Sequence, residues 1–165
     1  MKNLLLIFLF LCLPLLVSCT GFSPVYATNS PSRTAFSQIS MPPITGANGF
    51  LFAQEMHDRA GIQTGSSGEY RLDVRLTPRR LGFATRVDNV ITRFEVQIDA
   101  LWTLTDAKGV VLTKMTTTSS SVFDSPDSPY ASQVAEQDAE ARALAVLADN
   151  IINQLNFYFA AAADK

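Results

Sequence analysis

Apolar and polar residues alternate along three stretches in the middle of the chain: Glu69–Phe83, Val90–Thr105 and Val110–Phe123. A period of two residues is typical of a strand with one face buried and the other in water. The clearest case is the second stretch, whose apolar positions are Phe94, Val96, Ile98, Ala100, Trp102 and Leu104. Turns are predicted at Arg86–Asn89 and at Asp106–Gly109, the latter with a left-handed glycine. The pattern therefore predicts an antiparallel meander of three strands with a single apolar face.

Two further stretches repeat their apolar residues every three or four positions, which is the period of an amphipathic helix. The first is Gly46–Ala60, where Asn48 can serve as N-cap and Gly61 is a natural C-terminal stop. The second, Ser132–Phe159, carries one long apolar stripe made of Leu144, Leu147, Ala148, Ile151, Leu155 and Phe159. Each helix has one face to bury, and the apolar face of the meander can cover both.

Proline is frequent in Gly21–Pro43, at positions Pro24, Pro31, Pro42 and Pro43, and this predicts that the stretch contains no helix. Phe36–Met41 is extended in character, and we expect a short first strand there. The fold class predicted is α+β, a two-layer sandwich with two helices packed on one face of a four-stranded, mostly antiparallel sheet. If the first strand pairs beside the second, the Gly46–Ala60 helix is a right-handed crossover. Pro78 predicts a bend, a bulge or a sheet edge at its position.

The chain begins with one charge, Lys2, and a short apolar run that ends in Leu16-Val17-Ser18-Cys19. This is the pattern of a secretory signal, and the four residues resemble the lipobox of bacterial lipoproteins. The alternative is a transmembrane helix with a chance cysteine, but the run is short against the roughly 20 residues of a span and contains Pro14. We therefore expect residues 1–18 to be a cleaved signal peptide.

The lipobox resemblance implies that Cys19 is the site of lipid attachment and becomes the acylated first residue of the mature chain. Thr20 replaces the Asp that commonly retains such proteins in the inner membrane, which implies an outer-membrane, lipid-anchored, periplasm-facing location. We predict a tether over residues 19–35 and one α+β domain over residues 36–165. No disulfide can form in the mature chain, because Cys12 leaves with the signal and Cys19 is modified.

Composition argues against several classes of function. The formal net charge is −2, which is not the balance of a nucleic-acid-binding protein. His57 is the one histidine and lacks an evident nucleophile or metal-ligand partner, so we interpret it as ordinary surface. Glu136, Asp138 and Glu140 have the pattern of a solvated helix face. Gly65–Gly68 lacks the lysine of a phosphate loop. We therefore predict no enzyme activity, no metal and no cofactor.

Arginine is concentrated at one end of the predicted meander, where Arg79, Arg80, Arg86 and Arg93 surround the first turn and Arg71 and Arg75 extend the stripe. Guanidinium groups match the oxygens of phosphates and carboxylates in two-pronged geometry. The alternative is a solvated strand face balanced by Asp73, Asp88 and Glu95. The charge pattern alone leaves both interpretations open.

Several stretches resemble the LPS-assembly lipoprotein family LptE, particularly its alphaproteobacterial branch. They are Cys19–Tyr26, Arg86–Phe94, Trp102–Asp106, Tyr130-Ala131 with Ala135–Ala139, and Leu147–Leu155. No single motif is very specific, but their order covers nearly the whole mature chain. The resemblance implies a plug inside the outer-membrane barrel LptD that helps to fold the barrel and to pass lipopolysaccharide to the cell surface, with no enzyme activity.

The resemblance also implies that lipopolysaccharide contacts basic residues at one end of the sheet, here Arg86 and Arg93 first and Arg79 and Arg80 second. This chain departs from some relatives by carrying Gln133 where they have a basic residue, which puts a two-sided clamp in doubt. Two other classes remain open. One is an auxiliary lipoprotein of an envelope lipid or solute transporter. The other is a lipoprotein hydrolase, against which the absence of a visible nucleophile–base pair speaks.

Overall fold

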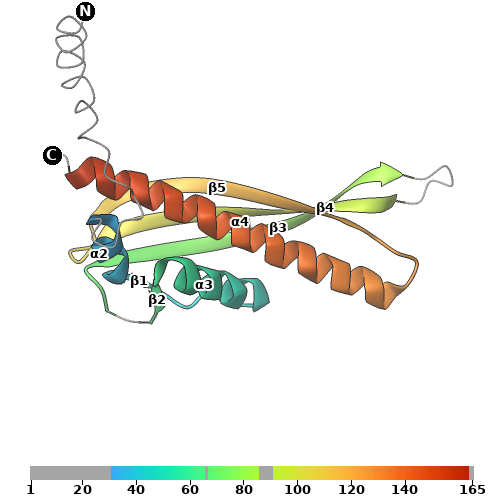
Figure 1. Cartoon of the computed structure of the whole chain (residues 1–165), viewed down its shortest axis with the longest axis horizontal. Helices are drawn as coiled ribbons and strands as arrows, with labels where there is room; N and C mark the ends of the chain where they lie inside the picture. Colours follow the sequence, from blue (N-terminus) through green and yellow to red (C-terminus); the bar gives the residue numbers. More distant parts are fainter. Residues whose placement is uncertain (1–30, 66, 86–90, 164–165) are drawn as a thin grey trace, which may run out of the picture. The chain divides into compact units, whose positions relative to one another are not determined.

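The computed structural model describes residues 31–65, 67–85 and 91–163. The chain divides into two units, Met1–Ser30 and Pro31–Lys165, and the second contains the folded domain. Its elements are α2 (Pro31–Ser37), β1 (Ile39–Met41), α3 (Ala47–Ala60), β2 (Gln63–Thr64), β3 (Tyr70–Thr85), β4 (Ile91–Asp106), β5 (Val111–Asp124) and α4 (Pro129–Ala163). The strands form one sheet in the order β2-β1-β3-β4-β5 (Figure 1).

The three long strands form the antiparallel meander that the alternating pattern predicts. Val74 on β3 pairs with Trp102 on β4, which pairs with Met115 on β5. Gly109 in the second turn has a φ of 81°, which is the left-handed conformation expected there. All five even-numbered residues from Val96 to Leu104 are buried, and Phe94 packs against the same core. The prediction of a single apolar face is therefore confirmed.

The α+β class is confirmed, but the prediction of four strands and two helices is incomplete, because the sheet has five strands and the described chain has three helices. Ser40 of β1 pairs in parallel with Gln63 of β2 and with Arg71 of β3. Helix α3 therefore connects two parallel strands as a crossover. Strand β2 has two exposed residues, too few to show a period. The first strand is also shorter than predicted, beginning at Ile39.

The prediction that proline excludes a helix from Gly21–Pro43 is wrong for α2. This helix begins at Pro31, and proline is tolerated at the first helical position because the N–H there has no partner within the helix. Phe36 on α2 is buried, and its ring meets the ring of Phe159 edge-on with centroids 6.1 Å apart. Short helix α2 therefore packs against the C-terminal turns of α4.

The predicted stop of α3 is confirmed and its predicted start is wrong. Gly61 takes a left-handed φ of 70°, and its N–H donates to the carbonyl of His57 at 2.8 Å. At the other end the N-cap is Gly46, not Asn48, and no side chain caps the helix. Pro78 lies in β3 beyond Arg71, where β1 no longer pairs with β3, so the predicted sheet edge is confirmed there.

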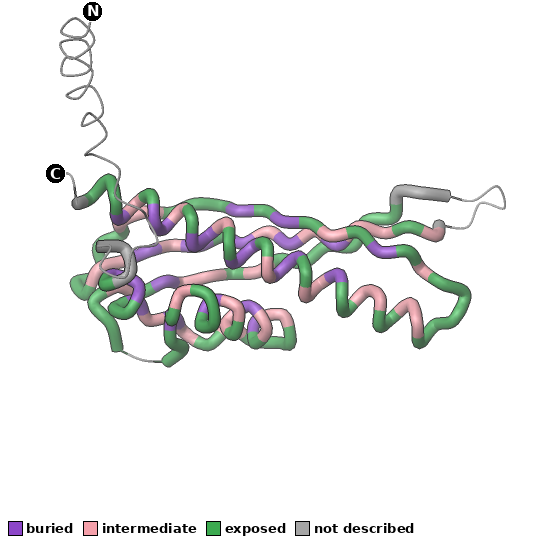
Figure 2. The backbone as a smooth tube through the Cα atoms, viewed as in Figure 1, coloured by how far each residue is buried: buried purple, intermediate pink, exposed green. Residues whose placement is uncertain are grey.

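Helix α4 crosses the apolar face of the meander and buries the whole predicted stripe from Leu144 to Phe159 (Figures 1 and 2). Trp102 is 1% exposed beneath it, and its indole N–H donates to the Thr117 hydroxyl at 3.0 Å. Thr117 in turn donates to the Gln154 side-chain oxygen at 2.8 Å. Because buried polar groups cost stability when unpaired, this chain of bonds fixes the position of α4 over β4 and β5.

Replacing Trp102 by alanine should lower the free energy of unfolding of the lipid-free domain by about 3–5 kcal/mol, because it leaves a cavity in the core. This is a large share of the roughly 5–15 kcal/mol of a typical domain. Urea unfolding measures the change. The control is Leu101→Ala, the next residue on the opposite sheet face and 40% exposed, with an expected loss of about 1 kcal/mol or less. Equal losses in the two variants would show that Trp102 is not the core residue.

Candidate functional site

The structure describes three of the five residues that the sequence predicts as functional. Arg79 and Arg80 lie past the middle of β3, opposite Gln97 and Val96, and Arg93 lies near the start of β4, opposite Ala84. Cys19 and Arg86 lie outside the described residues. The sheet end that carries Arg79, Arg80 and Arg93 is called the arginine end, and its three side chains have different surroundings.

Arg79 and Arg80 point to opposite faces of the sheet, because successive residues of a strand alternate. Arg79 shares the open face, the sheet face opposite α4, with Asp99 of β4, and the two form an ion pair. The Asp99 carboxylate also accepts bonds from the Thr118 hydroxyl at 2.8 Å and the Gln97 amide at 3.2 Å. The bond from Thr118, then that from Gln97, and the nearby Arg79 lower the pKa of Asp99 below its usual value. Asp99 therefore stays ionised beside Arg79.

Arg80 lies on the helix side of the sheet. Its guanidinium forms an ion pair with Glu136 of α4 at 2.9 Å. The central guanidinium carbon also lies 4.3 Å from the centre of the Phe94 ring, and Phe94 stacks on Phe123 at 5.5 Å. Cation–π contact and ion pairing together hold the first turns of α4 against the sheet. Arg80 therefore has a structural role that the charge pattern did not reveal.

Arg93 lies on the open face and forms an ion pair with Asp124 of β5 at 3.2 Å. Both side chains are largely exposed, Arg93 at 52% and Asp124 at 76%. An ion pair in this setting contributes about 1 kcal/mol or less, so another anion can replace Asp124 at little cost. Of the described arginines in the cluster, Arg93 is therefore the one best placed to bind a ligand.

The carboxylates that balance the cluster are not those that the sequence suggested. They are Asp99, Glu136 and Asp124. Asp73 pairs with Arg71, which extends the stripe, at 3.0 Å, so this part of the predicted balance is confirmed, and Asp88 lies outside the described residues. Each described arginine of the cluster thus has a partner supplied by another strand or by α4. Arg80 takes part in the packing of α4, whereas Arg93 has an exposed and replaceable partner. The structure therefore lies between the two interpretations that the sequence left open.

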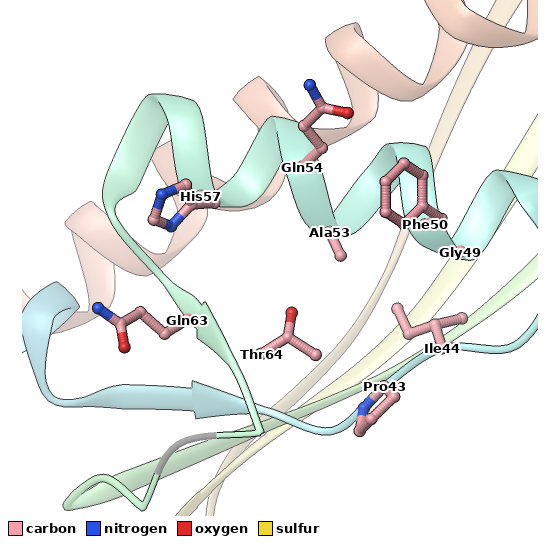
Figure 3. Close-up of a pocket in the computed structure, with 9 residues that line it drawn as sticks. All are labelled: Pro43, Ile44, Gly49, Phe50, Ala53, Gln54, His57, Gln63 and Thr64. Carbon is pink, nitrogen blue, oxygen red and sulfur yellow. The ribbon is translucent and has the colours of Figure 1, made fainter.

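A groove beside α3 is the feature that sequence reasoning missed (Figure 3). It has a volume of about 540 Å³, and Phe50, 69% exposed, stands at its rim. Its lining is Pro43, Ile44, Gly49, Phe50, Ala53, Gln54, His57, Gln63 and Thr64. The histidine is exposed, as predicted, and this lining holds no cysteine or carboxylate. The groove lies between α3, the Pro43-Ile44 segment that follows β1, and strand β2, and β2 is too short for the sequence to have predicted it.

The described part of the chain contains no group of three residues placed to hold a metal ion. Within the same ranges, no helix combines the length and the apolar character needed to cross a bilayer. The chemistry of the arginine end and the open face is therefore that of ion pairs, hydrogen bonds and an exposed polar surface. None of these side chains is arranged as a nucleophile with its base.

Comparison with solved structures finds lipoproteins with the same fold. A lipoprotein candidate from Caulobacter crescentus is 29% identical, with a TM-score of 0.65, and the match covers 78% of this chain and 96% of that one. A minor lipoprotein from Acinetobacter baumannii is 17% identical, with a TM-score of 0.58 and coverage of 73% and 91%. Lipoprotein B from Nitrosomonas europaea is 12% identical, with a TM-score of 0.63 and coverage of 88% and 96%. The last two show the fold alone.

Comparison with curated proteins gives no match. The model of one protein family, the lipopolysaccharide-assembly family LptE, matches residues 36–155 of this chain. That match covers more than half of the chain and runs from α2 into the last turns of α4. The chain therefore belongs to the LptE family of lipopolysaccharide-assembly proteins.

Proposed function

We propose that this chain is an outer-membrane lipoprotein that plugs and helps to assemble an LptD-type barrel, and that it assists lipopolysaccharide transport to the cell surface. The observation that carries the proposal is the LptE match across residues 36–155. LptE is a non-enzymatic family, so the expected activity is assembly and not catalysis. The alternative is an auxiliary lipoprotein of an envelope lipid or solute transporter, which would share the anchor and the small domain.

The polarity of the open face of the sheet supports the proposal that this chain is a plug. The central rows of this face are mostly polar: the uncharged residues Thr77, Gln97, Thr103, Thr116, Thr118 and Ser120 alternate with charged ones such as Arg79 and Asp99, and Leu101 is the apolar residue among them. The lumen of a wide outer-membrane barrel is polar as well. A polar sheet face can therefore lie against such a wall through hydrogen bonds and water, without an apolar patch that would aggregate before assembly.

Depleting the protein from cells should reduce the amount of correctly assembled LptD-type barrel and the amount of surface lipopolysaccharide together. The physical reason is that a barrel of this width closes around its plug. Heat-modifiable mobility of the barrel on gels and surface labelling of lipopolysaccharide measure the two effects. A plasmid copy of the wild type should restore both. Normal barrel assembly after depletion would favour the transporter alternative.

We propose that acyl chains on Cys19 hold the protein in the outer membrane. The support is the Leu16-Val17-Ser18-Cys19 sequence and the family of lipoproteins to which the fold belongs. One acyl chain of about fourteen carbons binds a bilayer only marginally, and two or more make a stable anchor. The predicted tether, residues 19–35, would then lead from the anchor into the domain, with its last residues in α2.

Labelling with a palmitate analogue should mark the wild type and leave Cys19→Ser unmarked. A useful control is Ser18→Ala, which keeps the thiol and a small residue before the cut, and it should be labelled as the wild type is. Equal labelling of wild type and Cys19→Ser would end the lipoprotein interpretation.

We propose that the arginine end, extended by Arg86, binds the phosphorylated head of lipopolysaccharide. Arg93 supports this proposal because its present partner, Asp124, is exposed and replaceable. Charge-assisted hydrogen bonds to phosphate contribute roughly 1.5–3 kcal/mol each, and less in salt and water. Arg80 supports the site indirectly, since it holds Phe94 and Glu136 in place beside it.

The double variant Arg86→Glu/Arg93→Glu of the lipid-free domain should bind lipopolysaccharide about tenfold more weakly, equivalent to about 1.4 kcal/mol, and with less dependence on salt, because the screened cation–phosphate contacts are gone. The control is Arg71→Glu, an equally exposed arginine at the far end of β3 whose partner Asp73 lies on the same strand. It should bind as the wild type does, and circular dichroism should show both variants folded. Wild-type affinity in the double variant would show that the cluster is a solvated strand end.

A further inference from the structure

Strand β5 presents one long hydrogen-bonding edge that no other described strand covers, since it is the last strand of the sheet. The Ser125 N–H donates to the Thr92 carbonyl at 2.8 Å, next to the register pair Arg93 and Asp124. In an antiparallel ladder this geometry makes Arg93 and Asp124 a pair without backbone hydrogen bonds between them. By alternation, the even-numbered residues of β5 direct their N–H and C=O groups away from β4. They are Lys114, Thr116, Thr118, Ser120, Val122 and Asp124.

This edge lacks the protection that the other sheet edges have. Strand β2, at the opposite end of the sheet, has two residues, and the uncovered part of β3 carries Pro78, Arg75 and Arg79 with bulges near its end. Short strands, prolines, charges and bulges are the usual means of preventing pairing with other chains. Along β5, residues 115–123 contain no charge and no proline, and Thr116, Thr118 and Ser120 are exposed. Arg142 of α4 reaches the edge near its end, where it donates to the Val122 carbonyl at 3.2 Å.

A second copy of this chain fits the edge poorly. Antiparallel self-pairing with Lys114 opposite Asp124 would centre on Ser119, whose hydroxyl donates to the Ala143 carbonyl of α4 at 2.8 Å. Both copies of α4 would then lie on one face, close to the centre of the pairing. Each would bring Arg142, which is paired with Asp138 of its own helix and already reaches over Ser121 and Val122, so that the side chains of the two helices would crowd the centre of the pairing. A strand without a helix on that face meets no such obstacle.

We infer that the outer edge of β5 pairs with an open edge strand of the barrel before the barrel closes. The inference rests on the proposed function and names one contact between this chain and the barrel. A closed barrel has no free edges, whereas an assembling one does. Thr116, Thr118 and Ser120 continue the polar open face toward the added strand, while on the other side of β5 helix α4 covers Thr117 and Ser119 and leaves Met115 exposed. The polar row on the open face can therefore continue into the lumen side of a barrel strand, which is polar as well.

The test compares two substitutions at one position in otherwise complete, lipidated protein. Ser120→Pro removes an N–H that points away from β4, so the internal ladder keeps its bonds. Ser120→Ala removes the hydroxyl and keeps that N–H. In cells depleted of the wild type, Ser120→Pro should slow assembly of the epitope-tagged barrel about tenfold, the effect of about 1.4 kcal/mol on a rate. Ser120→Ala should assemble it at the wild-type rate.

Equal assembly rates for Ser120→Pro and Ser120→Ala would overturn the inference and leave the proposed function standing. Unchanged assembly on depletion of the wild type itself would instead overturn the proposed function. Should Ser120→Pro fail to fold, a photo-crosslinking amino acid at position 120 replaces it. We expect crosslinks to the tagged barrel in a short pulse that decline in the chase. Crosslinks to a second copy of this chain, or none to the barrel, would overturn the inference.

Discussion

The structure depends on one packing event, the burial of the apolar stripe of α4 on a single face of the β4–β5 sheet. Trp102 fills the centre of that interface, and its bond to Thr117, continued to Gln154, fixes the helix against the strands. The Ser119 hydroxyl adds a bond to the Ala143 backbone. No disulfide assists this packing in the mature chain that we expect, so the core supplies the stability. The other side of the same sheet consequently remains free of any covering element among the described residues.

That one-sided arrangement determines where function can lie. The helix side is occupied, and Arg80 belongs to it through Glu136 and Phe94. The open face carries hydrogen-bonding side chains and the ion pairs of Arg79 and Arg93, which water and salt weaken. The edge of β5 adds backbone groups that point away from the sheet. Together these features describe a molecule that offers a polar surface on one side, and the chain belongs to a family of lipopolysaccharide-assembly proteins.

Sequence reasoning succeeded where a period was long enough to count. The three long strands and α4 show their faces over fourteen residues or more. It failed for β2, which has only two residues, and for α2, where Pro31 was taken as a barrier and is instead the first residue of the helix. The alternation in β3 already placed Arg80 with Leu72 and Val74, and this signal could have separated it from Arg79. Its partner Glu136 lies 56 positions away and could not be foreseen.

The central claim is that this LptE-family chain works in complex with an outer-membrane barrel. The most direct measurement is purification of the tagged, lipidated protein from detergent-solubilised envelopes, followed by identification of the protein recovered in comparable amount. The account predicts an LptD-type barrel in the outer-membrane fraction, held in washes at high salt. Recovery of an inner-membrane permease in its place, with no barrel, would contradict the account.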